Sequence, residues 1–225
     1  MKSCHVDRYI VSSTTTCTDD YLRAFAEILD LIALDQSKVI PCLWLTESGL
    51  SDEVLMYARC SGINWGCLKI HPALRPCEWK ENGETIHRLC ELSRVMGNLP
   101  ILIHTGNDES CRARKYEKII EQNPDLSFIL AHARPLEEAV YMAQTYTNVF
   151  VDTAFLPVKD IVKFVQLGLT ASVLWGSDYC IPAVYDEKII LKDYYQAKLK
   201  NLRKSIDSKA FLAITSDNAN TLFSN

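Results

Sequence analysis

The sequence predicts an α/β fold of a particular class, a TIM-type (β/α) barrel that is incomplete and has seven recognisable parallel strands. Short apolar runs alternate with longer amphipathic patterns along the whole 225-residue chain. Successive runs lie roughly 22–35 residues apart, which is the size of one βα unit. Runs that are apolar along their length are typical of strands buried on both faces of a parallel sheet. The seven runs are Arg8–Ser13, Val39–Leu45, Cys67–His71, Ile101–Thr105, Phe128–His132, Val149–Thr153 and Val173–Ser177.

Two further observations favour a barrel over an open sheet. The first run is not followed by a glycine-rich phosphate loop, which an open nucleotide-binding sheet often has. Polar residues also recur at the C-terminal ends of the runs, and in a barrel these ends meet at one active-site mouth. The alternative is an open flavodoxin-like sheet, which the strand order would distinguish. The polar strand-end residues are Ser12, Ser13, Lys69, His71, His104, His132, Asp152 and Asp178.

Amphipathic helices are expected between the strands. The segment Asp20–Leu34, for example, carries Phe25, Leu29 and Ile32 at helical spacing. No linker, repeat or low-complexity segment interrupts the alternation, so residues 1–225 are expected to form a single domain. The other predicted helices are Asp52–Cys60, Glu84–Met96, Arg112–Gln122, Leu136–Thr145, Lys159–Leu167, Asp186–Lys204, Ser208–Ile214 and Asn218–Phe223.

Composition argues against several classes of partner. The formal net charge is -4, which disfavours nucleic acid and anionic membranes as main partners. No apolar run approaches the roughly 18–20 residues that a membrane-spanning helix needs. The nine cysteines form no CxxC pair. An odd number of cysteines without a secretory signal indicates reduced thiols in a cytoplasmic protein.

Three strand ends carry residues suited to metal-assisted chemistry. His104 and His132 end two neighbouring runs, and Asp178 follows the last run. A lone histidine at a strand end is more often a hydrogen-bonded structural residue than part of a site. Imidazole and carboxylate together suit one divalent metal ion such as zinc. A carboxylate beside a metal-bound water can also accept a proton from that water.

Five motifs in order resemble the amidohydrolase-type family, which includes aminocarboxymuconate-semialdehyde decarboxylase. The closing segment Ala213–Phe223 is also similar to the last helix of that family, so the resemblance covers nearly the whole chain. The motifs are LKIHP at Leu68–Pro72, ILIHTG at Ile101–Gly106, FILAHARP at Phe128–Pro135, NVFVDTA at Asn148–Ala154 and LWGSDYC at Leu174–Cys180.

The resemblance implies roles for the strand-end residues. His104 matches a metal ligand, and Asp178 matches the metal-bound carboxylate that also manages the proton of the nucleophilic water. His132 matches the histidine that assists catalysis or polarises the substrate. Asp152 is expected to be structural.

A second set of residues is expected to contact the substrate. Lys69 and His71 share one face of their strand because side chains alternate with period two, and this face is expected to line the mouth. Arg134 and Arg75 each follow a strand end and could bind a substrate carboxylate. The alternative is that both arginines are exposed and only form surface salt bridges.

The chain departs from the family at its beginning. The family starts with a strand that carries His-x-His, which supplies two metal ligands, and this sequence has no His-x-His. The segment before Ser13 resembles the second strand of the family instead; a degenerate first-strand motif at His5, Val6 and Asp7 is the alternative. His104 and Asp178 alone give two ligands, while a catalytic zinc usually has three. A barrel without its first strand also has two unpaired edges, so either a homodimer that covers them or a tendency to aggregate is expected.

Three functions are compatible with these observations. The first is a metal-dependent hydrolase of the amidohydrolase superfamily that acts on a small molecule through metal-activated water. The second is a non-hydrolytic decarboxylase with the same ligands, since a fold does not fix its chemistry. The third is a truncated or non-catalytic relative that keeps the barrel but has an incomplete metal site.

Overall fold

The strands form one parallel sheet whose spatial order follows the sequence. The computed structural model describes residues 6–74, 79–80 and 83–224. Each strand pairs in parallel with the next strand along the chain, in the order β1-β2-β3-β4-β5-β6-β7. The strands are β1 (Tyr9–Val11), β2 (Val39–Trp44), β3 (Cys67–Ile70), β4 (Ile101–His104), β5 (Phe128–Ala131), β6 (Val149–Asp152) and β7 (Val173–Leu174).

This order confirms the predicted barrel-type fold with seven parallel strands. A flavodoxin-like sheet would show a reversal in strand order, and none occurs here. Within the described part of the chain, β1 and β7 each have one strand neighbour, so the barrel is not closed by a pairing between them.

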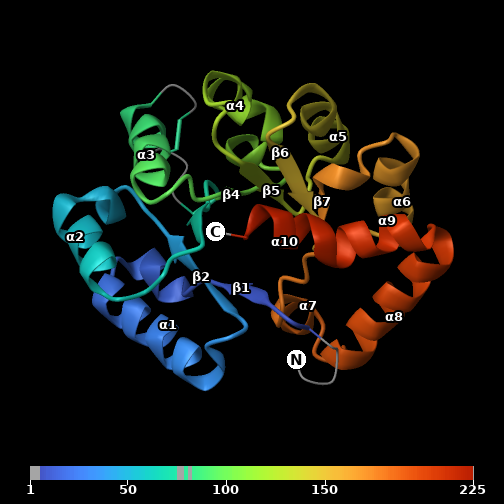
Figure 1. Cartoon of the computed structure of the whole chain (residues 1–225), viewed down its shortest axis with the longest axis horizontal. Coiled ribbons are helices and arrows are strands. Elements are labelled where there is room, and N and C mark those ends of the chain that lie inside the picture. Colours follow the sequence, from blue (N-terminus) through green and yellow to red (C-terminus); the bar gives the residue numbers. More distant parts are fainter. Residues whose placement is uncertain (1–5, 75–78, 81–82, 225) are drawn as a thin grey trace.

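Helices α1 to α6 surround the sheet on its outer side, whereas α10 is directed toward its centre (Figure 1). Local capping explains where some of them begin: the side chain of Asp20 accepts a hydrogen bond from Arg23 N at the start of α1, and Ser51 accepts one from Val54 N at the start of α2. The helices are α1 (Tyr21–Asp35), α2 (Asp52–Cys60), α3 (Glu84–Val95), α4 (Glu117–Gln122), α5 (Leu136–Thr145), α6 (Val158–Gln166), α7 (Ile181–Tyr185), α8 (Leu191–Ser205), α9 (Ser208–Leu212) and α10 (Asn218–Leu222).

The helix expected at Asp186–Lys204 begins later than predicted. Asp186 has an extended backbone with φ -144° and ψ 102°, and its Oδ1 accepts a hydrogen bond from Lys188 N. An aspartate that binds the backbone two residues ahead favours a turn over a helix. The chain therefore forms the short helix α7, a turn, and then α8.

Two apolar cores lie on opposite faces of the sheet. The larger core contains the side chains between the strands and the outer helices, such as Leu43, Leu68 and Ile103. The smaller core lies inside the ring of strands. It contains the alternate strand residues and Phe223, which immediately follows α10. Figure 1 shows α10 directed toward the centre of the ring. The inner core consists of Ile40, Cys42, Cys67, Ile129, Leu174 and Phe223.

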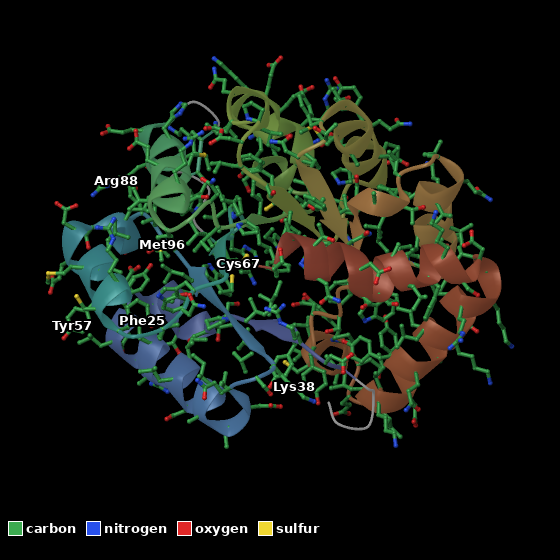
Figure 2. The ribbon with its side chains drawn as sticks, viewed as in Figure 1. Phe25, Lys38, Tyr57, Cys67, Arg88 and Met96 are labelled. Carbon is green, nitrogen blue, oxygen red and sulfur yellow. The ribbon has the colours of Figure 1, made fainter. Side chains whose placement is uncertain are left out.

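The side-chain view shows the same division between inside and outside. Cys67 lies near the centre of the molecule, whereas Tyr57 and Arg88 lie on the outer helices (Figure 2). Cys67 is fully buried and Tyr57 is exposed. Because strand side chains alternate, the inner face continues from this core to Trp44, Lys69, His104 and Asp152 at the C-terminal ends.

Candidate active site at the C-terminal ends of the strands

A continuous arc of five rings lines the C-terminal ends of the strands. Each ring comes from a successive strand or from the loop after it. The ring centroids of His71 and His104 are 3.7 Å apart with an interplanar angle of 14°, so these two imidazoles are stacked. Trp44 stacks on His71 at 5.6 Å, His132 meets His104 edge-on at 4.9 Å, and Phe155 meets His132 edge-on at 5.4 Å. We call this set the ring arc.

A cation lies at each end of the ring arc. The ammonium of Lys69 is 4.1 Å from the centre of the Trp44 ring. The guanidinium of Arg134 is 5.1 Å from the centre of the Phe155 ring. Both distances are within the range in which a cation is attracted to an aromatic face. The ring arc therefore presents an aromatic wall with positive charge at either end.

The three histidines are uncharged near neutral pH. Burial lowers the pKa of His71 to about 4, and the positive charge of Lys69 adds to this effect. Burial and the neighbouring His71 hold the pKa of His104 well below its usual range. Burial also lowers the pKa of His132, while the negative charge of Asp178 opposes this shift. Neutral imidazoles can both donate and accept hydrogen bonds.

Two of these imidazoles have a ring nitrogen that has no hydrogen-bond partner among the described residues. His71 Nδ1 and His132 Nδ1 are buried, and neither forms a hydrogen bond with another described residue. A buried polar atom without a partner costs roughly 1–3 kcal/mol, so such atoms are usually explained by a function or a ligand. Both atoms lie in the ring arc, where a bound molecule could satisfy them.

Asp152 holds the backbone of this region in place. Its Oδ1 accepts hydrogen bonds from His132 N at 3.2 Å and from Ala154 N at 2.7 Å. Burial raises the pKa of Asp152 to about 6, and these two hydrogen bonds oppose the rise. A Cβ atom at Gly176 would lie 2.7 Å from Asp152 Oδ1, so only glycine lets the end of β7 approach this carboxylate. These contacts agree with the expected structural role of Asp152.

Lys198 of α8 also reaches this region. Its Nζ donates a hydrogen bond to Thr153 O at 2.6 Å. Burial lowers the pKa of Lys198 to about 8, and the negative charge of Asp152 opposes this shift. Lys198, which lies in the helix predicted at Asp186–Lys204, is thus half-buried and directed into the molecule.

The backbone is strained where the candidate side chains leave the strands. Five non-glycine residues with positive φ follow β5, β6 and β7. Such conformations cost on the order of 1–3 kcal/mol each and often accumulate at functional sites. Asp178, with φ 46°, is among them and is half-buried after β7. The five residues are His132, Ala133, Phe155, Asp178 and Cys180.

The described residues do not fit a divalent metal ion. They contain no group of three His, Cys, Asp or Glu side chains that could hold one. A ligating imidazole directs its lone pair in the plane of its ring, with a zinc–nitrogen distance of about 2.0–2.1 Å. The stacked planes of His71 and His104 are nearly parallel, so their lone pairs do not converge on a common ion. The expected pair His104 and Asp178 thus gains no third ligand from His71.

The structure brings most of the predicted site residues together. Lys69, His71, His104, His132 and Arg134 all contribute to the ring arc or its ends. Asp178 lies close enough to influence the pKa of His132. His5 and Arg75 lie outside the described residues.

Sequence reasoning missed three residues of this region: Trp44, Phe155 and Lys198. Trp44 continues the inward alternation of Ile40 and Cys42, so period-two spacing could have identified it. Phe155 lies in a loop and Lys198 in a helix, where no such spacing signals their position.

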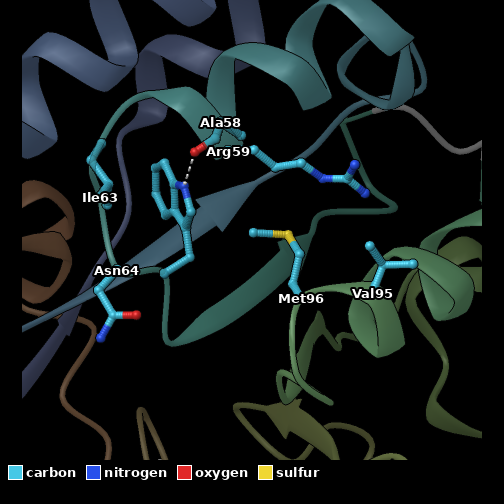
Figure 3. A pocket seen from close by; sticks show the side chains of 7 residues that line it. Ala58, Arg59, Ile63, Asn64, Val95 and Met96 are labelled. Carbon is cyan, nitrogen blue, oxygen red and sulfur yellow. Dashed lines mark hydrogen bonds between the residues drawn. The ribbon is translucent and has the colours of Figure 1, made fainter.

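A separate surface groove lies at the opposite ends of the strands. It is formed by residues between α2 and β3 and by the end of α3, and the indole of Trp65 donates a hydrogen bond to Ala58 O at 3.0 Å beside it (Figure 3). Active sites of (β/α) barrels lie at the C-terminal ends of the strands, so this groove is not the candidate site.

Solved structures show the same fold. An uncharacterised TIM-barrel protein from Bordetella bronchiseptica superposes with a TM-score of 0.74 and 16% identity, covering 100% of this chain and 80% of that protein. A 2,6-dihydroxybenzoate decarboxylase from Rhizobium superposes with a TM-score of 0.69 and 12% identity, and the match covers 100% of this chain and 86% of that protein. A 5-carboxyvanillate decarboxylase from Novosphingobium aromaticivorans was solved in complex with manganese and a nitrobenzoic acid. It superposes with a TM-score of 0.69 and 15% identity, and the match covers 99% of this chain and 77% of that protein.

Other comparisons are negative. No protein-family model matches the chain, and no curated protein matches it. Among the described residues, no helix is both long and apolar enough to span a membrane. The structural likeness, at these low identities, establishes the TIM-barrel fold.

Proposed function

We propose that this chain is an amidohydrolase-type enzyme that acts on a small aromatic carboxylate, with decarboxylation as its reaction. The observation that carries the proposal is the ring arc with a cation at each end. An aromatic acid offers a flat face that can pack on the rings and anionic oxygens that Lys69 and Arg134 can bind. The two solved decarboxylases of the same fold, which are named for aromatic acids, support this choice.

The proposed reaction needs one proton donor at the ring. Asp178, a carboxylate before the substrate binds, takes up a proton from solvent and gives it to the ring carbon that bears the carboxylate. The bond between that carbon and the carboxylate then breaks, its electron pair returns to the ring, and carbon dioxide leaves. Asp178 remains as a carboxylate and regains a proton from solvent. His132, which is neutral, donates a hydrogen bond to the charge that develops on the substrate.

Hydrolysis is the second candidate, and the sequence motifs are compatible with it as well as with decarboxylation. In that reaction Asp178 accepts a proton from water as the water oxygen attacks a carbonyl carbon, and His132 stabilises the resulting oxyanion. No step is assigned to a metal ion, because the described residues do not fit one. A non-catalytic binding protein is the third candidate, and the incomplete ligand set favours it.

The deciding experiment measures carbon dioxide release from 2,6-dihydroxybenzoate and 5-carboxyvanillate. We expect turnover by the wild-type chain and a loss of about 10²–10⁴-fold in Asp178→Asn, the range of a general acid–base group. Asparagine tolerates the positive φ of this position, so the fold should persist. Asp30→Asn on the exposed face of α1 is the matched control and should keep full activity.

Two results would count against the proposal. Equal activity in Asp178→Asn and the wild type would remove Asp178 from the mechanism. Binding of both acids without any turnover would favour the non-catalytic alternative.

A further inference from the structure

The inner face of β3 places a fixed positive charge inside the candidate site. Lys69 is half-buried and follows the buried Cys67 on the same face of the strand. Its Nζ lies over Trp44, which stacks on His71, and His71 in turn stacks on His104. The charge of Lys69 acts on His71, His104, His132 and Asp152. The positive charge of Lys69 therefore acts on groups that would otherwise be candidate metal ligands.

The charge balance of the site favours binding of an anion over binding of a divalent metal ion. Among the described residues of the region, the side chains with a formal charge are the cations Lys69, Arg134 and Lys198 and the anions Asp152 and Asp178. One net positive charge remains. A divalent ion would raise it to three, whereas a monocarboxylate would neutralise it. Like charges a few ångströms apart repel strongly where water is scarce.

We infer that Lys69 Nζ supplies the positive charge that a divalent ion would otherwise supply at this mouth, and that the site binds its anionic substrate without a resident metal. The stacked geometry of His71 and His104, the absence of a three-ligand group among the described residues, and the net charge all support this inference. The identity of the substrate as an aromatic carboxylate rests on the proposed function. The role of Lys69 in place of a metal does not.

The first test measures metal binding directly. The full chain is dialysed against Zn²⁺ or Mn²⁺ and then against metal-free buffer, and its metal content is determined by elemental analysis. We expect well under one ion per chain in the wild type. Lys69→Met should retain more Zn²⁺ than the wild type, because the competing charge is gone. Lys159→Met, which removes an exposed lysine of α6, is the matched control and should behave like the wild type.

The second test measures binding of 2,6-dihydroxybenzoate by calorimetry with and without a chelator. We expect the same dissociation constant in both conditions and a weakening of about tenfold or more in Lys69→Met, as for a lost charge-assisted hydrogen bond. Lys159→Met should bind as the wild type does. Circular dichroism melting of each variant verifies that it is folded.

The outcomes separate the inference from the proposed function. About one tightly held ion per wild-type chain, or Lys69→Met and wild type that retain equal amounts of Zn²⁺, would overturn the inference. Weaker binding of the acid in the presence of chelator would do the same. If no folded variant binds the acid, the proposed substrate class fails, and the metal measurement on the wild type and Lys69→Met still decides the role of Lys69.

Discussion

At the scale of single residues, the most consequential feature is the neutrality of the buried histidines. Burial lowers the pKa values of His71, His104 and His132 in the folded chain relative to about 6.5 in an unfolded chain. Between these values the unfolded chain binds more protons than the folded chain. Stability therefore rises with pH in this window and is lost as the pH falls through about 6.5 toward 4.

We predict that lowering the pH from 7 to 5 reduces the free energy of unfolding by about 2–4 kcal/mol. Asp152 opposes part of the loss. Its folded pKa of about 6 lies above its unfolded value, so its protonation favours the folded state as the pH falls. In His104→Asn the loss should shrink by about 1–2 kcal/mol. Urea unfolding at both pH values measures the free energy of unfolding. His87→Asn, on the exposed face of α3, is the control. If His104→Asn loses as much stability between pH 7 and pH 5 as the wild type does, His104 does not cause the pH dependence.

At the scale of elements, period-two alternation made much of the site predictable. The apolar runs gave all seven strands, and alternation placed Lys69 and His71 on one face. The same logic does not extend to loops. Phe155 reaches the ring arc through a positive-φ turn after β6, and no local pattern signals that turn. The late start of α8 was missed because the turn at Asp186 depends on one side-chain hydrogen bond.

The contact between the ends of β6 and β7 gives an element-scale prediction. In Gly176→Ala the new Cβ would lie within 2.9 Å of three side-chain atoms of Asp152. Overpacking of this kind costs about 1–3 kcal/mol, and a displaced Asp152 would also release His132 N. We expect a lower free energy of unfolding by thermal or urea denaturation. Gly106→Ala, whose Cβ would make only ordinary contacts, is the control. Equal stability of the two variants would show that β7 has room to move.

At the scale of the whole molecule, the C-terminal segment completes the interior of the barrel. Phe223 belongs to the same inner core as residues of β2, β3, β5 and β7, and its backbone oxygen accepts a hydrogen bond from Arg8 beside β1. The segment thus links both ends of the sheet.

We predict that Phe223→Ala lowers the free energy of unfolding by about 3–5 kcal/mol, as for other buried aromatic truncations. Leu212→Ala, at an exposed position, should cost far less. Similar losses in both variants would contradict this role for the segment.

The gap between β1 and β7 leads to a proposal about assembly. Neither strand has a second strand neighbour among the described residues, and open sheet edges favour pairing with another chain. Figure 1 shows α7 beside this gap, and its residues Val184 and Tyr185 are 72% and 82% exposed. We propose that a second copy covers the gap.

Light scattering after gel filtration should then give twice the chain mass of 25.5 kDa. Tyr185→Glu should shift the population toward monomer, because a buried carboxylate would be costly at the interface. Leu34→Glu introduces the same charge at an equally exposed apolar position on α1 and should leave the mass unchanged. A wild-type chain that stays monomeric at 100-fold higher concentration would refute the proposal.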